Sequence, residues 1–316
     1  MVAVAGIEVR SMIARLTLEC LVRPVVIVSA PRAGSTLLAE TLRELPQIWT
    51  IGGESHQILE SLPSLTPRAK GYASNRLVAE DLTARMRTRL QAIFLGGMRD
   101  RKRRPYVKHR LGSPARFLEK TPRNVIRVPF LNALFPDALF VLLVRDPRQN
   151  VSSIMDAWQA GERFVNLRKL PGWEAGEAWK AGEWKLLLTS GWRALRAPSL
   201  ADVAALQWSE ANDLAIRDLE VVPADRKCTV DYDELVADPM TTLQRVCAFA
   251  GLSMDLEFRA RLAGGLAHSS ATVTPPRPDK WKKNEKAMES RMAPLLAQWV
   301  GIQAVHVAWR DGWRRG

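Results

Sequence analysis

The stretch VVIVSAPRAGSTLL, residues 25–38, decides the fold of this chain. It opens with four consecutive β-branched residues, which are typical of a buried parallel strand. The apolar residues that follow, Leu37, Leu38 and Leu42, have the spacing of a helix face. A tight turn therefore joins a strand to a helix, and this order predicts an α/β fold with a central parallel sheet.

The turn between the strand and the helix contains groups that bind a phosphate. Arg32 supplies a cation, and Ser35 and Thr36 supply hydroxyls. Ala33 and Gly34 add backbone N–H groups at a helix N-terminus, where the macrodipole favours an anion. The turn lacks the GxxxxGK[ST] spacing of nucleotide triphosphatases, so nucleotide hydrolysis is not the first interpretation. The alternative is an ordinary strand-to-helix turn with a surface arginine.

The composition indicates a globular and strongly basic protein. The 316 residues are 47% hydrophobic, enough for one sizeable α/β domain or two small ones. Because no linker is visible, we expect one domain over residues 1–316. The formal net charge of +13 suits a polyanion, an anionic membrane surface or a multiply charged small molecule.

Cysteine usage and the N-terminal segment predict the compartment. Cys20, Cys228 and Cys247 are odd in number and have no metal-type spacing, which favours a reduced, cytoplasmic protein. A short amphipathic helix is expected over residues 7–21, and its charged residues argue against a signal peptide or a transmembrane segment.

A carboxylate follows the second expected strand, residues 48–51. Glu54 stands after the Gly52-Gly53 turn. Since open parallel sheets bind ligands beyond the carboxyl ends of their strands, this is a plausible position for an active-site group. The alternative is that Glu54 is a helix-capping or solvated acid.

The most strand-like run, residues 138–144, is expected in the centre of the sheet. Arg145 ends it, and the next helix carries Ser153 in its second turn. Both side chains could reach a ligand over the same sheet edge, an arrangement suited to a second phosphate. Further expected elements are a helix through residues 128–135, a helix over residues 200–219 and a strand over residues 227–232.

Two segments are expected to be helical insertions on the substrate side, residues 57–116 and 158–200. The first contains the basic run of residues 99–104, which is either a solvated loop or a contact for an acidic substrate. The second contains five tryptophans, which either cover the active site or form an acceptor-binding wall, or else form the core of a buried helical hairpin.

Two motifs together resemble the sulfotransferases that use 3′-phosphoadenosine-5′-phosphosulfate (PAPS). PRAGSTLL, residues 31–38, resembles the 5′-phosphosulfate loop of that family. VRDPRQNVSS, residues 144–153, resembles its 3′-phosphate motif, in which an arginine and a serine eight positions later bind the phosphate; here these are Arg145 and Ser153. The resemblance extends from about residue 24 to residue 281. It implies a three-layer α/β/α fold with a P-loop-like phosphosulfate-binding turn.

Two further residues resemble the pattern of one branch of the family, which includes tyrosylprotein and many bacterial sulfotransferases. Glu54 stands where that branch keeps its catalytic glutamate, and Lys120, in EKTP, stands where it keeps its catalytic lysine. Tyr232 resembles the family tyrosine near the nucleotide. The resemblance thus implies that Glu54, Lys120 and Arg32 are catalytic. It also implies a set of nucleotide-binding residues, namely Arg32, Ala33, Gly34, Ser35, Thr36, Arg145, Ser153 and Tyr232.

Two places depart from the family pattern. Pro122 occupies the place of the base histidine of the cytosolic branch, which leaves His56 and His109 as substitute bases. Asp279 precedes Lys280-Trp281 where the branch often has a serine, so a nucleotide contact from that loop is in question.

The resemblance implies transfer of a sulfuryl group from PAPS to a hydroxyl of a small-molecule, lipid or glycoside acceptor. The product nucleotide is 3′-phosphoadenosine-5′-phosphate (PAP). No metal is required, and no nucleic acid is expected as a partner. A homodimer is compatible with these features, and the sequence leaves the oligomeric state open.

Two other classes of function compete with this one. A P-loop kinase of small molecules predicts a Walker lysine, which is missing. A non-enzymatic binder of nucleic acid or of an anionic membrane would use residues 99–104 and the basic C-terminus, but it leaves Glu54, Lys120 and the two motifs unexplained.

Overall fold

The computed structural model describes residues 20–109, 114–174, 182–273 and 277–315. The helix expected over residues 7–21 lies almost entirely outside this range. Among the described residues, no helix is both long enough and apolar enough to cross a membrane.

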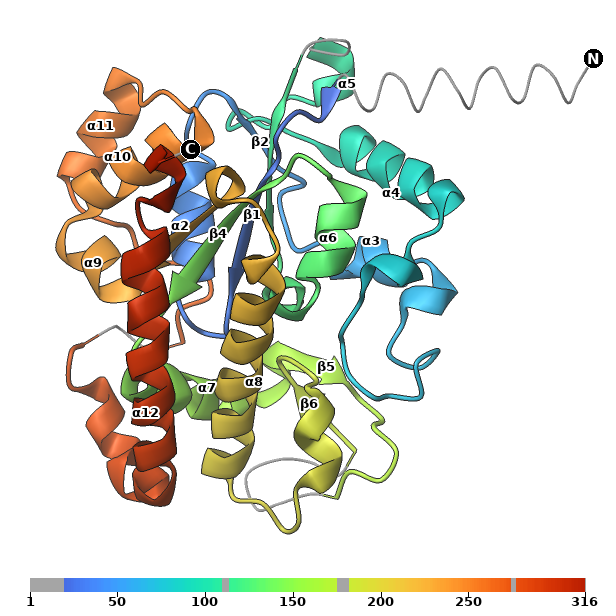
Figure 1. Cartoon of the computed structure of the whole chain (residues 1–316), viewed down its shortest axis with the longest axis vertical. Coiled ribbons are helices and arrows are strands. Elements are labelled where there is room, and N and C mark those ends of the chain that lie inside the picture. Colours follow the sequence, from blue (N-terminus) through green and yellow to red (C-terminus); the bar gives the residue numbers. More distant parts are fainter. Residues whose placement is uncertain (1–19, 110–113, 175–181, 274–276, 316) are drawn as a thin grey trace, which may run out of the picture.

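A five-stranded parallel sheet forms the centre of the protein (Figure 1). Its strand order is β2-β3-β1-β4-β7, and every neighbouring pair is parallel. The strands are β1 (Val25–Ser29), β2 (Ile48–Trp49), β3 (Arg116–Lys120), β4 (Leu139–Val144) and β7 (Lys227–Asp231). The predicted α/β class is therefore confirmed, and both apolar runs of the sequence lie inside the sheet.

The alternation of side chains along β1 builds two separate layers of core. Val26 and Val28 face one cluster of buried residues, and Val25 and Ile27 face the other. The first cluster includes residues of α4 (Ala84–Gly97), α6 (Val128–Leu134), α7 (Pro147–Gln159), α8 (Leu200–Glu220) and α12 (Glu285–Trp309). The second includes residues of α2 (Ser35–Leu42), α9 (Tyr232–Ala237), α10 (Pro239–Ala250) and α11 (Leu256–Ala263). Helices thus cover both faces, as the three-layer prediction requires.

The sheet differs from expectation at one strand. β3 was not predicted, because Arg116, Glu119 and Lys120 interrupt its apolar pattern. Its central residues Phe117 and Leu118 are buried all the same, since β3 lies between β2 and β1. This position puts the end of β3 between the ends of the two strands that carry Glu54 and the phosphate-type turn.

The first of the two segments expected as insertions contains the short helices α3 (His56–Glu60) and α5 (Tyr106–His109) and the long helix α4. The second is not the helical segment expected: its described residues contain the antiparallel pair β5 (Val165–Leu167) and β6 (Trp184–Lys185) and two short 3₁₀ helices. We propose, as before, that the whole chain forms one domain.

The tryptophans of the second segment form a core. Trp158, Trp173, Trp184 and Trp192 are all buried, and Trp184 makes edge-to-face contacts with Trp158 and Trp173 at 5.3 and 4.8 Å between ring centroids. None of these four lines the large pocket described below. Of the two interpretations of this segment, the buried core is therefore correct for the described tryptophans.

Candidate active site

The phosphate-type turn lies between the end of β1 and the start of α2. Its backbone takes left-handed conformations at Arg32, with φ of 65°, and at Gly34, with φ of 114°. A Cβ atom on Gly34 would lie only 2.5 Å from the ring of Tyr232. Glycine is therefore required at position 34 for two reasons, its positive φ angle and the close approach of the Tyr232 ring.

The second motif holds the first one in place. Arg145 Nη1 donates a hydrogen bond to the carbonyl of Arg32 at 3.1 Å, and its guanidinium stacks on the ring of Tyr232 at 3.9 Å. Asn150 Nδ2 donates to the carbonyl of Pro31 at 2.7 Å. Sequence reasoning missed Asn150, although it lies within the second motif. The ends of β1, β4 and β7 are thus tied together at one edge of the sheet.

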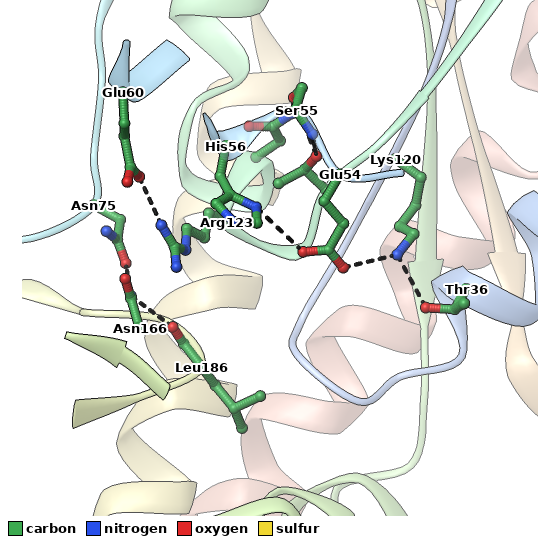
Figure 2. Close-up of polar contacts among 12 residues, drawn as sticks. Thr36, Glu54, Ser55, His56, Glu60, Asn75, Lys120, Arg123, Asn166 and Leu186 are labelled. Atoms are coloured by element: carbon green, nitrogen blue, oxygen red, sulfur yellow. Dashed lines mark hydrogen bonds and ion pairs between the residues drawn. The ribbon is translucent and has the colours of Figure 1, made fainter. Parts of the chain in front are cut away.

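Lys120 connects the turn to the predicted base. Its Nζ donates to Thr36 Oγ1 at 3.0 Å and to Glu54 Oε1 at 3.1 Å. The other carboxylate oxygen of Glu54 lies 3.5 Å from Nδ1 of His56. Figure 2 shows these four side chains as one line of contacts. The structure therefore brings together three groups that are 18 to 84 positions apart in the chain.

These contacts set the charge of Glu54. Burial alone would raise the pKa of this carboxyl, but the contacts with His56 and Lys120 outweigh it and lower the pKa to about 2. Glu54 is therefore ionised at neutral pH, as a general base must be. The substitute base His56 lies directly against it, and the side chain of His109 lies outside the described residues.

The turn carries a concentrated positive charge. Burial, followed by repulsion from Arg163 and Arg145, lowers the pKa of Arg32 to about 10. Burial also lowers the pKa of Arg145. Both arginines remain cations at neutral pH, and their mutual repulsion is relieved when an anion binds between them.

A buried network of hydrogen bonds fixes the loop that carries Glu54. Ser55 donates from its backbone N to Thr121 Oγ1 at 2.7 Å and from its hydroxyl to Glu119 Oε1 at 2.6 Å. Glu119 Oε1 also accepts from Thr121 at 2.7 Å and from Asn124 at 2.9 Å. Burial raises the pKa of Glu119. Sequence reasoning missed this network, which fixes the loop of Glu54 to the end of β3.

A pocket of about 840 Å³ opens over these groups. Nine of the ten predicted site residues line it: Arg32, Gly34, Ser35, Thr36, Glu54, Lys120, Arg145, Ser153 and Tyr232. The tenth, Ala33, does not line it: its side chain is fully buried, and its N–H donates to the carbonyl of Ala30 at 3.3 Å. Among the described residues, no group of His, Cys, Asp and Glu is arranged to hold a metal ion.

The C-terminal loop reaches the pocket despite its departure from the family pattern. Lys280 and Trp281 both line the pocket. The loop is attached to α7 through Asp156, whose carboxylate lies 3.3 Å from Lys280 Nζ and 2.7 Å from Lys283 Nζ. It therefore lies on the same side of the pocket as Ser153, one helical turn before Asp156.

The pKa of Glu54 gives a first prediction. Replacing His56 by Phe removes one of the two contacts that lower this pKa, so we expect the Glu54 carboxyl to titrate above its value of about 2. Carboxyl-detected NMR titration of the wild type and the variant measures the change. Because the folded pKa lies below the ordinary value of 4.5, ionised Glu54 stabilises the fold above that pH, and this contribution is lost as the pH falls toward 2. An unchanged titration would contradict the role given to His56.

Comparison with known proteins gives the family. The sequence profile of the sulfotransferase family matches residues 24–186 and 184–256. No curated protein matches the chain. A sulfotransferase from Alicyclobacillus acidocaldarius is 16% identical, with 93% of this chain and 100% of that chain covered and a TM-score of 0.48. Sulfotransferase STF9 from Mycobacterium avium is 16% identical, with coverage of 89% and 77% and a TM-score of 0.47. Since the profile spans most of the chain, including both phosphate motifs, this protein belongs to the sulfotransferase family.

Proposed function

We propose that this transferase moves a sulfuryl group from PAPS to a hydroxyl of a small-molecule, lipid or glycoside acceptor, which yields a sulfate ester and PAP. The family supports sulfuryl transfer in general. The single observation that carries the finer proposal is the position of Lys120, which contacts both Thr36 of the phosphate-type turn and Glu54. One lysine thus joins the donor site to the proposed base.

The residues of the pocket fit this donor. PAPS carries anionic groups at the 3′ and 5′ positions of its ribose, and two arginines, Arg32 and Arg145, line the pocket together with Ser153. Within the described part of the chain, Nε of Arg32 is buried and has no hydrogen-bond partner. A buried donor without a partner is costly, and an anionic oxygen would satisfy it.

The proposed step is an in-line displacement at sulfur. The acceptor oxygen forms a bond to sulfur while the bond from sulfur to the bridging phosphate oxygen breaks. Glu54 takes the hydroxyl proton as general base. Lys120 and Arg32 stabilise the negative charge on the departing oxygen.

Lys120 links the basicity of Glu54 to the binding of the donor. Its contact lowers the pKa of Glu54 while no donor is bound. When Lys120 turns toward the donor, that contact weakens and Glu54 becomes a stronger base. The base is thus activated at the moment when there is a sulfuryl group to transfer.

The basic run at residues 99–104 supports this proposal over a polyanion binder. Arg101 is paired with Asp255 and with Glu257, each at 3.0 Å, and Arg104 with Asp100 at 2.7 Å. These charges are partly neutralised within the protein and do not line the pocket. The three cysteines are free and buried, which supports a reducing, cytoplasmic compartment as part of the proposal.

Calorimetric titration tests the donor. We expect PAP without metal to bind the protein at least about 100-fold more tightly than ATP with magnesium, because the 3′-phosphate adds charged hydrogen bonds at Arg145. A preference for ATP with magnesium would overturn the sulfotransferase mechanism in favour of the kinase. Failure of PAP to bind at all would remove the donor assignment.

A further inference from the structure

The pocket continues past the proposed base. In Figure 2 the contacts run from Thr36 through Lys120 and Glu54 to His56; Arg123 lies beyond His56, and Leu186 lies below Arg123 in this view. An in-line reaction requires the acceptor to approach opposite the departing phosphate, which on this line is the side away from Thr36. The acceptor therefore belongs at the end of the pocket beyond Glu54.

The pocket lining near His56 combines apolar side chains with the guanidinium of Arg123. Among the residues that line the pocket, Pro122 precedes Arg123 in the chain and Leu186 lies near it in Figure 2, so both supply apolar surface beside the guanidinium of Arg123. Arg163 also lines the pocket, but it interacts with Arg32 and donates to the carbonyls of Ser270 at 2.6 Å and Thr272 at 3.3 Å. An acceptor here would place an apolar body against these walls and meet Arg123 with one polar group.

The charge around Arg123 is not balanced. Arg123 Nη1 donates to Glu60 Oε1 at 2.6 Å, and the same oxygen lies 3.4 Å from Nη2 of Arg127. Arg127 is fully buried, and its Nη1 has no hydrogen-bond partner among the described residues. The guanidiniums of Arg123 and Arg127 thus share the carboxylate of Glu60. This leaves one positive charge without a carboxylate partner at this place. The other carboxyl that attracts Arg127 is Glu119, but its Oε1 accepts hydrogen bonds from Ser55, Thr121 and Asn124.

We propose that Arg123 binds a carboxylate of the acceptor and that the acceptor is a hydroxylated carboxylic acid with an apolar body. This inference rests on the proposed function and names the acceptor class for the same pocket. A carboxylate matches the single unbalanced charge and the planar fork of a guanidinium. Glu60 and Arg127 hold that fork in place.

Binding of 10-hydroxydecanoate and of its methyl ester to PAP-saturated protein tests the proposal by calorimetry. The two probes share the hydroxyl and the apolar chain and differ at one end, where the acid has a carboxylate and the ester has a neutral methyl ester group. We expect the acid to bind about 10- to 100-fold more tightly than the ester. Arg123→Gln is expected to abolish this preference without changing the affinity for PAP, and Arg123→Lys to keep part of it.

A matched control is Arg43→Gln, which removes a charge from another pocket-lining arginine and should leave the preference for the acid intact. Equal binding of acid and ester, absence of binding by the acid, or a preference that survives Arg123→Gln would each overturn the proposal. Unchanged affinity for PAP shows that the variant is folded. If PAP itself does not bind, the donor assignment fails, and the same pair of probes titrated without PAP still decides the role of Arg123.

Discussion

Replacing Glu54 by Gln is expected to lower turnover by about two to four orders of magnitude, the usual contribution of a general base. Gln keeps the size of the side chain and an oxygen that accepts from Lys120 Nζ, now 3.1 Å from Glu54 Oε1, but it cannot take a proton. The affinity for PAP should change little. The measurement is the rate of PAP release with any acceptor that the wild-type enzyme sulfates.

The matched control for this experiment is Glu40→Gln. Glu40 also lines the pocket, but its carboxylate accepts hydrogen bonds from the backbone N and the hydroxyl of Ser270. We expect this variant to retain turnover within a few-fold of the wild type. Near-normal turnover of Glu54→Gln would remove Glu54 from the mechanism and make His56, 3.5 Å from it, the next base to test.

Replacing Arg145 by Ala is expected to weaken PAP binding by about 2–3 kcal/mol, or roughly 30- to 150-fold. The variant loses the charged contact with the 3′-phosphate. It also loses the hydrogen bond from Arg145 to the carbonyl of Arg32 and the stacking on Tyr232, so the phosphate-type turn becomes less well held. Calorimetry with PAP measures the loss, and thermal unfolding of the variant shows whether the fold is retained.

Arg148→Ala is the control within the same motif. Arg148 is bonded to Asp146 at 2.6 Å, lies over the ring of Trp281 at 5.6 Å and does not line the pocket. We expect its loss to leave PAP affinity nearly unchanged, since its charge is already paired. Equal affinity for PAP in Arg145→Ala and in the wild type would contradict the assignment of the 3′-phosphate site.

The sequence by itself determined the class of fold and the two phosphate motifs. Residues 25–28 and 138–144 predict buried parallel strands, because continuous β-branched and apolar runs suit strands covered on both faces. Gly34 and its neighbours predict a phosphate-type turn, because its short side chains and free N–H groups are local properties. The fold class and the family were therefore available before the structure.

Only the tertiary structure decided which side chains meet. The strand order β2-β3-β1 places the ends of three strands side by side, and this brings Lys120 to both Thr36 and Glu54. It also decided that the described tryptophans of residues 158–192 are core, and that Arg123 and Leu186 lie at the same end of the pocket. The physical reason is that hydrophobic periodicity and turn chemistry act between near neighbours in sequence, whereas contacts across 66 or 84 positions depend on strand order and packing.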